Sequence, residues 1–318
     1  MIRVSHLSKR YGDHTAVSDI SFHIEKGVIY GFLGPNGAGK STTMNILTGC
    51  LSATAGEVMI LGHNIEEEPM KAKRHIGYLP EIPPVYMDMT PREYLLFVLE
   101  AKNVPKKDRG RQLESAMEKT GVTPMQHRLI RNLSKGYRQR VGIAQALLGD
   151  PEIIILDEPT VGLDPKQIIE IRELIRELGK SHTVILSSHI LSEVQSVCEK
   201  VLIISGGRLL AVDTAENLAR LLSGHEKMHL TVAGDAAKAL LLLETLPNCR
   251  IAGTATLENG ETEITLRPLS DCDIRKSVFD LFAANGLSLL EMHTEKASLE
   301  DVFLTLTANP DEKEAQTE

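Results

Sequence analysis

Two patterns of apolar and polar residues occur along the first 220 residues: continuous apolar runs, and stretches in which apolar and polar residues alternate. Runs rich in apolar residues predict buried strands of a parallel sheet; these are Val28–Leu33, His75–Leu79, Ile153–Leu156 and Thr183–Ser188. Apolar and polar positions alternate in other stretches that predict antiparallel strands; these are Ile2–Val4, Ala16–Ile24 and the hairpin of Val201–Ile204 with Arg208–Val212. The pattern predicts an α/β fold with an antiparallel edge.

A helical pattern interrupts this sheet between residues 88 and 150. Thr90 is suited to cap a helix, Pro91 to occupy its first position and Glu93 to close a capping box. Helical spacing continues with loop breaks as far as Leu148. We therefore predict a helical insertion within a first domain that spans residues 1–220.

Residues 225–308 predict a separate, smaller α+β domain. Its elements follow the order β-α-β-β-α-β, which is typical of a ferredoxin-like fold; they are Met228–Ala233, Ala236–Leu246, Arg250–Leu257, Glu261–Arg267, Ile274–Ala284 and Leu287–His293. Asn259 and Gly260 suit the hairpin turn, and Ser298 suits the start of a closing helix. Residues 309–318 form a charged tail that we expect to be solvated.

Composition and charge narrow the possible partners. The 318 residues contain 35 Lys and Arg against 43 Asp and Glu, a net charge of −8, which does not favour a nucleic-acid surface. No apolar run approaches the ~20 residues of a membrane helix, and no signal peptide is evident at Met1. The four cysteines include no C-x-x-C pair. We expect a reduced, cytoplasmic chain without a zinc site and without a nucleic-acid partner.

A glycine-rich loop carries the strongest chemical signal. Residues 34–41 fit the pattern G-x-x-x-x-G-K-[ST] at every fixed position, between a predicted strand and a predicted helix. The residues expected to bind nucleotide here are Gly34, Pro35, Asn36, Gly37, Ala38, Gly39, Lys40, Ser41 and Thr42. Lys40 would reach the β- and γ-phosphates, and the Ser41 hydroxyl would hold Mg²⁺. A chance glycine turn before a helix is the alternative, and the predicted strand and helix on either side of the loop argue against it.

Two carboxylates and a histidine end the later buried strands. Asp157 is suited to hold Mg²⁺, and Glu158 to orient or deprotonate an attacking water. His189 ends the next strand at the same sheet edge and could bond a γ-phosphate oxygen. Surface carboxylates and a structural histidine are the alternatives. The apolar strand and the upstream phosphate loop favour the catalytic interpretation.

Two further sites are ambiguous from the residues alone. Tyr11 could stack on an adenine ring or simply pack half-buried. Ser134 and Gly136 open a predicted helix and could bind an anion through a hydroxyl, an N–H group and the helix dipole. A plain N-cap followed by a basic surface explains the same residues.

Together the motifs resemble the ATP-binding cassette family, the nucleotide-hydrolysing subunits of ABC transporters, over residues 1–220. In that family's terms the parts are the aromatic Tyr11, the Walker A loop, Glu81 at the Q-loop position, the signature Leu133–Tyr137, the Walker B strand Ile153–Glu158, Asp164 in the D-loop and the switch His189. Two residues depart from the pattern, because Glu81 replaces Gln and the signature is LSKGY. Both departures, and the tail, resemble the branch that pairs with ABC-2-type exporters.

The resemblance implies a P-loop ATPase that uses ATP and Mg²⁺, with Glu81 near the metal and Asp164 near the nucleotide. It implies a head-to-tail homodimer or paired cassette, in which Ser134 and Gly136 reach the γ-phosphate held by the other protomer's Lys40. A separate membrane permease would bring the chain to the inner face of the membrane. The alternatives are a soluble regulatory cassette, a P-loop kinase or GTPase, and, for Glu81, a solvated loop carboxylate.

Overall fold

The computed structural model describes residues 1–220, 227–257, 260–269, 273–295 and 299–307. It divides into two compact units, Met1–Thr214 and Ala215–Glu318, and each is described by itself. The division comes earlier than the predicted boundary near residue 220. Helix α8 (Ala215–Arg220) contacts α11 (Leu299–Thr307), and Leu218 on α8 is buried, so α8 belongs to the second unit.

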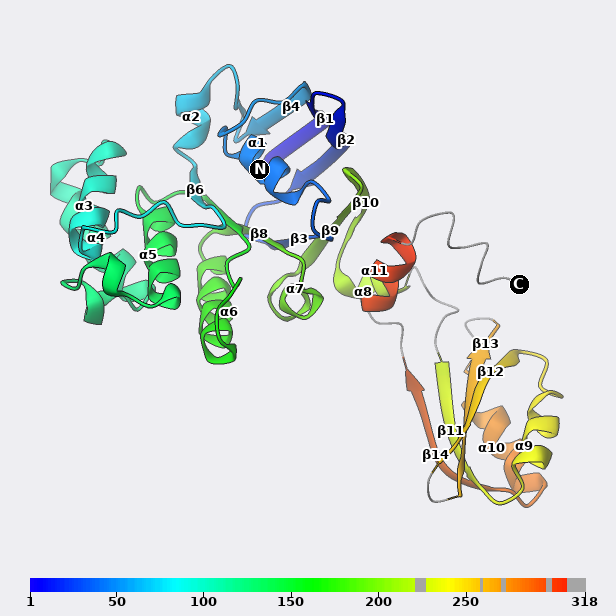
Figure 1. Cartoon of the computed structure of the whole chain (residues 1–318). Helices are drawn as coiled ribbons and strands as arrows, with labels where there is room; N and C mark the ends of the chain where they lie inside the picture. Colours follow the sequence, from blue (N-terminus) through cyan, green and yellow to red (C-terminus); the bar gives the residue numbers. More distant parts are fainter. Residues whose placement is uncertain (221–226, 258–259, 270–272, 296–298, 308–318) are drawn as a thin grey trace. The chain divides into compact units, whose positions relative to one another are not determined.

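A six-stranded sheet in the order β10-β9-β3-β8-β7-β6 forms the centre of the first unit (Figure 1). Its strands are β3 (Ile29–Leu33), β6 (Ile76–Leu79), β7 (Ile153–Asp157), β8 (Thr183–Ser188), β9 (Lys200–Ser205) and β10 (Arg208–Asp213). Only the β9–β10 hairpin is antiparallel within this sheet. Every residue of β3, β7 and β8 is buried, as their apolar runs predict. Their carboxyl ends therefore meet at one edge, where loops can share a site.

A four-stranded antiparallel sheet in the order β2-β1-β4-β5 forms the predicted edge of the unit. Its strands are β1 (Ile2–Tyr11), β2 (His14–Ile24), β4 (Ala55–Ile60) and β5 (His63–Asn64). The prediction ended the first strand at Val4, which is wrong, because β1 continues to Tyr11. Register shifts between Val4 and Arg10 break the simple alternation, so the sequence pattern did not show the longer strand.

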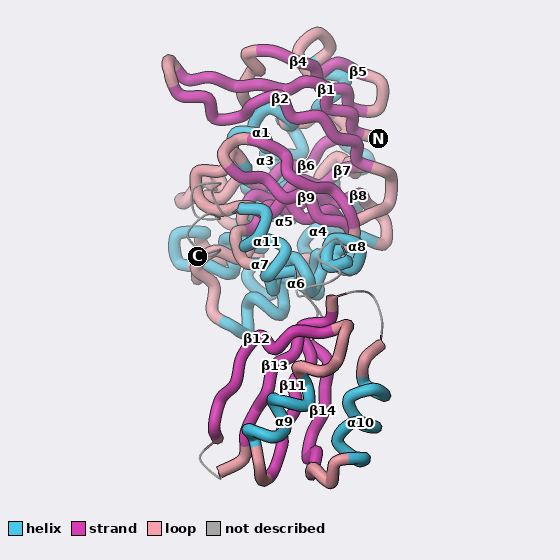
Figure 2. The backbone as a smooth tube through the Cα atoms, turned by 90° about the vertical axis from the view of Figure 1, so that its right-hand side faces the viewer, coloured by secondary structure: helices cyan, strands magenta, loops and turns pink. Residues whose placement is uncertain are grey.

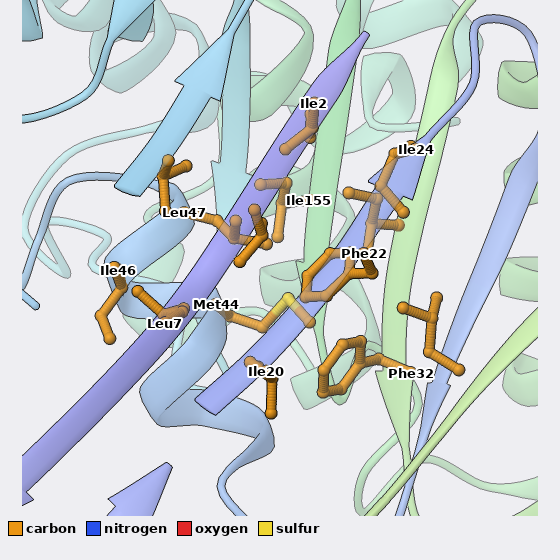
Figure 3. Close-up of a cluster of buried hydrophobic side chains, with 14 of the residues drawn as sticks. Ile2, Leu7, Ile20, Phe22, Ile24, Phe32, Met44, Ile46, Leu47 and Ile155 are labelled. Carbon is orange, nitrogen blue, oxygen red and sulfur yellow. The ribbon is translucent and has the colours of Figure 1, made fainter. Parts of the chain in front are cut away.

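Helix α1 (Lys40–Leu47) shares an apolar core with both sheets of the first unit (Figure 3). Ile2 and Phe22 contribute to this core from the antiparallel sheet, and Phe32 and Ile155 from the central sheet. Met44 of α1 is fully buried in the same cluster. The packing fixes the start of α1, and hence the loop before it, against the carboxyl end of β3.

The predicted helical insertion consists of α3 (Pro91–Ala101), α4 (Lys106–Lys119) and α5 (Lys135–Leu147), with two short 3-10 turns before α5. The Thr90 side chain accepts from Glu93 N, and Glu93 Oε2 accepts from Thr90 N at 2.8 Å, which is the expected capping box. Figure 1 shows these helices together beside β6. A Cβ atom on Gly77 of β6 would lie 2.0 Å from the Ala146 carbonyl oxygen, so α5 meets β6 backbone to backbone.

Three further helices complete the first unit. Helix α2 (Pro69–Lys73) precedes β6, α6 (Pro165–Gly179) joins β7 to β8, and α7 (Leu191–Val197) joins β8 to β9. Helices α6 and α7 contact each other and both contact β8. They cover the central sheet on the side away from α1, which explains why β8 is buried throughout.

The second unit contains a four-stranded antiparallel sheet in the order β12-β13-β11-β14. The elements are β11 (Lys227–Ala233), α9 (Ala236–Leu243), β12 (Cys249–Thr256), β13 (Thr262–Pro268), α10 (Arg275–Ala284) and β14 (Ser288–Glu295). Both helices lie on one face of the sheet (Figure 2). They cover a core that includes Leu230, Ile264 and Phe282. Among the turn, helix-start and tail residues predicted from sequence, Asn259, Ser298 and 309–318 lie outside the described residues.

Membrane-spanning length is not reached by any helix in the part of the chain that the structure describes.

Candidate active site

The loop between β3 and α1 has the backbone shape that its glycines permit. Gly37 and Gly39 have φ angles of +79° and +100°, in the left-handed region that favours glycine. A Cβ atom on Gly39 would lie 2.5 Å from the Ala16 carbonyl oxygen. Gly39 also caps α1, so the first N–H groups of the helix open toward the loop. The loop therefore presents a concave set of donors suited to an anion.

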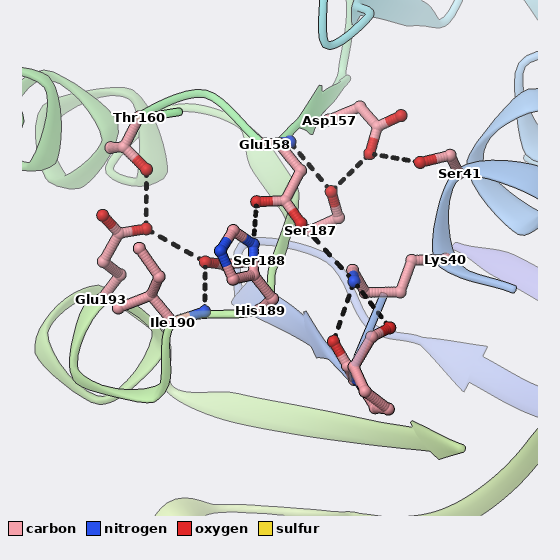
Figure 4. A network of polar contacts seen from close by, with 12 residues as sticks. Lys40, Ser41, Asp157, Glu158, Thr160, Ser187, Ser188, His189, Ile190 and Glu193 are labelled. Atoms are coloured by element: carbon pink, nitrogen blue, oxygen red, sulfur yellow. Dashed lines mark hydrogen bonds and ion pairs between the residues drawn. The ribbon is translucent and has the colours of Figure 1, made fainter. Parts of the chain in front are cut away.

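Lys40 lies inside this loop with only 6% of its surface exposed. Its Nζ donates to the Gly34 carbonyl at 2.8 Å and to the Pro35 carbonyl at 3.2 Å. The same ammonium lies 3.5 Å from Glu158 Oε1 (Figure 4). The cation is thus held between the loop backbone and the acidic end of β7.

Asp157, at the end of β7, faces the start of α1. Ser41 Oγ donates to Asp157 Oδ1 at 3.3 Å, and Ser187 Oγ donates to the same oxygen at 2.5 Å. Asp157 pairs with Ser187 in the parallel register of β7 and β8. A buried carboxylate beside a hydroxyl offers the oxygen ligands that Mg²⁺ prefers.

Glu158 has an unusual backbone for a residue other than glycine, with a φ angle of +48°. This left-handed conformation costs on the order of 1 kcal/mol. The Ser187 hydroxyl accepts the Glu158 N–H at 2.9 Å and so holds the strained residue. His189 Nδ1 lies 3.0 Å from Glu158 Oε2. The carboxylate is 7% exposed and has two basic neighbours, Lys40 and His189.

A cavity of about 550 Å³ opens over the loop. Most of the predicted nucleotide-contacting and catalytic residues line it: Tyr11, Asn36, Gly37, Gly39, Lys40, Ser41, Thr42, Glu81, Glu158 and His189. Tyr11 is 48% exposed at the cavity, and Lys9 Nζ lies 5.3 Å from its ring centroid. The ring is half exposed at the cavity, so a bound base could reach it.

A second group of predicted residues does not line this cavity. Ser134 caps α5, and its Oγ accepts from Tyr137 N at 3.3 Å. Asp164 caps α6 and accepts from Gln167 N at 2.9 Å. A Cβ atom on Gly136 would lie 2.6 Å from Gln167 Oε1, so Gln167 joins the two caps. The structure therefore collects the predicted residues into two separate groups.

Ser187 is a site residue that the sequence reasoning missed. The prediction treated it only as the end of a buried strand, yet it contacts both Asp157 and Glu158. A polar residue that ends an apolar strand beside Asp157's strand was the available signal. The strand order that makes them neighbours is not local information.

Tyr78 on β6 lies behind the loop helix. Burial, and to a lesser extent the charge of Asp157, raises the pKa of the Tyr78 phenol above its usual value. The hydroxyl stays protonated and donates to Asn45 Oδ1 at 3.3 Å on α1. This bond adds a polar tie between α1 and the central sheet.

A parallel sheet with a phosphate loop after β3, and with paired carboxylates at the end of β7 on the far side of β8, defines a P-loop nucleoside triphosphatase. Comparison with known proteins gives the family. Residues 17–161 match the family model described as ABC transporter. The chain belongs to the ABC transporter family and is an ATP-binding, ATP-hydrolysing cassette.

The similarity to individual proteins extends over nearly the whole chain. It is 32% identical over 308 residues to the linearmycin resistance ATP-binding protein LnrL of Bacillus subtilis (strain 168), covering 96% of this chain and 98% of that protein. It is 35% identical to the bacitracin transport ATP-binding protein BcrA of Bacillus licheniformis, covering 96% and 97%. The alternative of a P-loop kinase or GTPase is therefore wrong.

The fold is also found in solved cassettes. A dimeric ATP-binding cassette in a post-hydrolysis state, bound to ADP and Pi, superposes with a TM-score of 0.61 at 25% identity. The match covers 67% of this chain and 98% of that one. The resemblance to the ABC ATPases, and the fold expected from it, are confirmed.

Proposed function

We propose that the chain is the ATP-hydrolysing subunit of an exporter, which pairs with a second cassette around two ATP molecules and drives a separate membrane subunit. One observation supports the proposed pairing of two cassettes. Lys40, Glu158 and His189 line the cavity, whereas Ser134 and Gly136 open a different helix away from it. The helix start at Ser134 is left for a nucleotide held by another protomer.

Each residue of the cavity has a proposed role. The loop N–H groups and Lys40 bind the β- and γ-phosphates, and Tyr11 stacks on the base. Glu158 orients the attacking water and accepts its proton, because its carboxylate is buried and faces the cavity. His189, within reach of Glu158, bonds the γ-phosphate. Glu81 lines the cavity from the loop after β6 and would face the metal and the attacking water.

Mg²⁺ fits the residues present. Ser41 Oγ and Asp157 Oδ1 lie 3.3 Å apart, so a hydroxyl and a carboxylate oxygen are both at hand to hold the ion. When bound, the metal would neutralise charge on the phosphate oxygens. Ser187 would keep the Asp157 carboxylate oriented toward it.

A membrane partner would dock beside Glu81. The loop after β6 and the start of the helical insertion expose apolar side chains, among them Ile82 (81%), Tyr86 (52%) and Phe97 (42%). The rings of Tyr86 and Phe97 are 5.4 Å apart, so they form one surface. Exposed apolar clusters of this kind mark protein interfaces. The loop that carries Glu81 would thus connect the nucleotide to the membrane subunit.

Export is supported by the names of the relatives, one a resistance protein and one a transport protein. Removal of a toxic compound from the cell explains resistance. The chain would then act in the cytoplasm, at the inner face of the membrane. A soluble regulatory cassette without a membrane partner is the competing function.

Mixed protomers test the composite site. Lys40→Ala removes the loop cation, and Ser134→Arg blocks the helix start, so each homodimer loses both of its sites. In a mixed dimer one site carries both changes and the other carries neither. We expect ATPase activity to reappear on mixing, and the wild-type specific activity to rise with protein concentration. Activity independent of concentration while monomers become dimers on sizing would contradict the pairing.

A reconstitution experiment tests the membrane role. Purified chain is added to vesicles that contain the membrane protein encoded beside it, and ATP-dependent movement of a labelled antibiotic peptide is followed. The loop variant Ile82→Asp should lower transport and leave the ATPase of the free chain unchanged. A chain that hydrolyses ATP but binds no such membrane protein would favour the soluble regulatory cassette.

A further inference from the structure

One buried carboxylate near the cavity has no role in the mechanism above. Glu193 lies on α7, is 4% exposed, and does not line the cavity. Its Oε2 accepts from Thr160 Oγ1 at 2.6 Å and from Ser188 Oγ at 3.0 Å (Figure 4). A buried charge is unfavourable unless it is well bonded, so a residue of this kind needs an explanation.

The two hydroxyls that bond Glu193 belong to the two segments that carry the catalytic pair. Thr160 comes two residues after Glu158, and Ser188 comes directly before His189. Ser188 Oγ also accepts from Ile190 N at 3.0 Å, which closes a turn around His189. One carboxylate oxygen therefore holds the segments on both sides of the contact between His189 and Glu158.

The other oxygen of Glu193 faces α6. Glu193 Oε1 lies 3.9 Å from Arg172 Nη2, and within the described part of the chain it accepts no hydrogen bond. Arg172 lies on the helix that Asp164 caps. The carboxylate thus faces three segments: the loop after β7, the turn after β8, and the helix that follows the D-loop.

The contact between His189 and Glu158 is short, and the backbone of Glu158 is strained. His189 Nδ1 and Glu158 Oε2 are 3.0 Å apart, and Glu158 has the left-handed backbone described above. Small displacements of either segment would separate the pair. We propose that Glu193 is a positioning residue that keeps His189 and Glu158 together for hydrolysis. The inference rests on the catalytic roles given to those two residues under the proposed function.

A double-mutant cycle on ATPase rates tests the proposal. Glu193→Ala should lower kcat on the order of 10- to 100-fold, because small misplacements of reacting groups have effects of this size. KM for ATP should stay within about twofold, since the phosphate loop is untouched. In a His189→Ala background the same substitution should lower kcat by less than about threefold, because the two changes remove one contact.

Conservative variants separate positioning from folding. Glu193→Gln keeps an oxygen that can accept from both hydroxyls and should restore kcat to within about fivefold of wild type. Thr160→Val and Ser188→Ala remove the donors and leave the acidic residue in place, and each should lower kcat with KM unchanged. Glu177→Gln, an exposed carboxylate on α6, is the control and should leave kcat unchanged.

The outcomes distinguish the two proposals. If Glu193→Ala is folded and keeps wild-type kcat, or if its effect multiplies fully with that of His189→Ala, Glu193 has no positioning role. If His189→Ala itself has wild-type activity, the catalytic role of His189 fails first. A lower thermal midpoint with kcat retained would show that Glu193 serves stability alone and would also overturn the inference.

Discussion

In the central sheet of the first unit, polar side chains gather where strands end, whereas in the sheet of the second unit they spread over one face. Asp157, Ser187 and Ser188 follow apolar residues in strands that are buried throughout. In β11, buried Met228, Leu230 and Val232 alternate with partly exposed residues.

The difference follows from how each sheet is covered. Helices pack on both sides of the parallel sheet, so only the strand ends can carry chemistry. The antiparallel sheet of the second unit has helices on one face, and its other face carries paired side chains. His229 and His293 stack there with ring centroids 5.0 Å apart, and His229 contacts Glu263 at 3.1 Å. We therefore expect substitutions at the carboxyl ends of the central-sheet strands to lower ATP hydrolysis. Substitutions at the amino ends of these strands, or in the second unit, should affect hydrolysis less.

The largest effect is expected at the carboxyl end of β7. Glu158→Gln should lower kcat by about 10²- to 10⁴-fold, because the water loses its base, while Lys40 and the loop still bind ATP. Turnover and ATP binding are measured separately, and the variant should accumulate as an ATP-bound dimer. Glu152→Gln, just before the amino end of the same strand, is the control and should stay near wild type. Equal losses of kcat in both variants would contradict the expectation that only the carboxyl end of β7 carries catalytic groups.

Ser187 provides a second test at the same edge. Ser187→Ala removes a hydroxyl that holds both the Asp157 carboxylate and the Glu158 N–H. Residues behind a metal ligand typically affect metal affinity or activity by about 10- to 100-fold. We expect the Mg²⁺ concentration for half-maximal activity to rise about tenfold. Ser181→Ala, before the amino end of β8, should leave it unchanged, and an unaltered Mg²⁺ dependence in Ser187→Ala would remove Ser187 from the site.

These residues also show the limits of sequence reasoning. The apolar run Ile153–Leu156 and the capping box at Thr90 are local patterns, and both elements were predicted correctly. Ser187 and Glu193 depend on which strands and helices become neighbours, and a single sequence does not state this. The extension of β1 to Tyr11 was missed because its register shifts disturb the alternation.

A moderate effect is expected at Glu81, which lies in the loop after β6. Glu81→Gln keeps the side-chain oxygen and should retain ATPase activity within about several-fold. Glu81→Ala should lower transport more than it lowers the ATPase of the chain alone. Paired transport and ATPase rates are measured with the membrane partner. If Glu81→Ala changes neither rate, Glu81 is a solvated loop carboxylate.

The smallest effect on hydrolysis is expected from the second unit. Phe282 is buried in its core, and Phe282→Ala should destabilise that unit by about 3–5 kcal/mol. ATPase activity should remain within about twofold, because every proposed catalytic group belongs to the first unit. Thermal unfolding followed beside ATPase rates checks both parts. A parallel loss of ATPase activity would show that the second unit supports the active site.

The close approach of α5 to β6 at Gly77 has a mechanical consequence. With no layer of side chains at that point, a displacement of β6 would be passed directly to α5, which would turn about this contact as about a pivot. The 13 residues of α5 give a rod about 20 Å long, with Ser134 at its other end. A rotation of about 5° at the pivot moves Ser134 by about 2 Å, enough to make or break a hydrogen bond. A small displacement of β6 would thus decide whether the Ser134 end of α5 can bond to its partner.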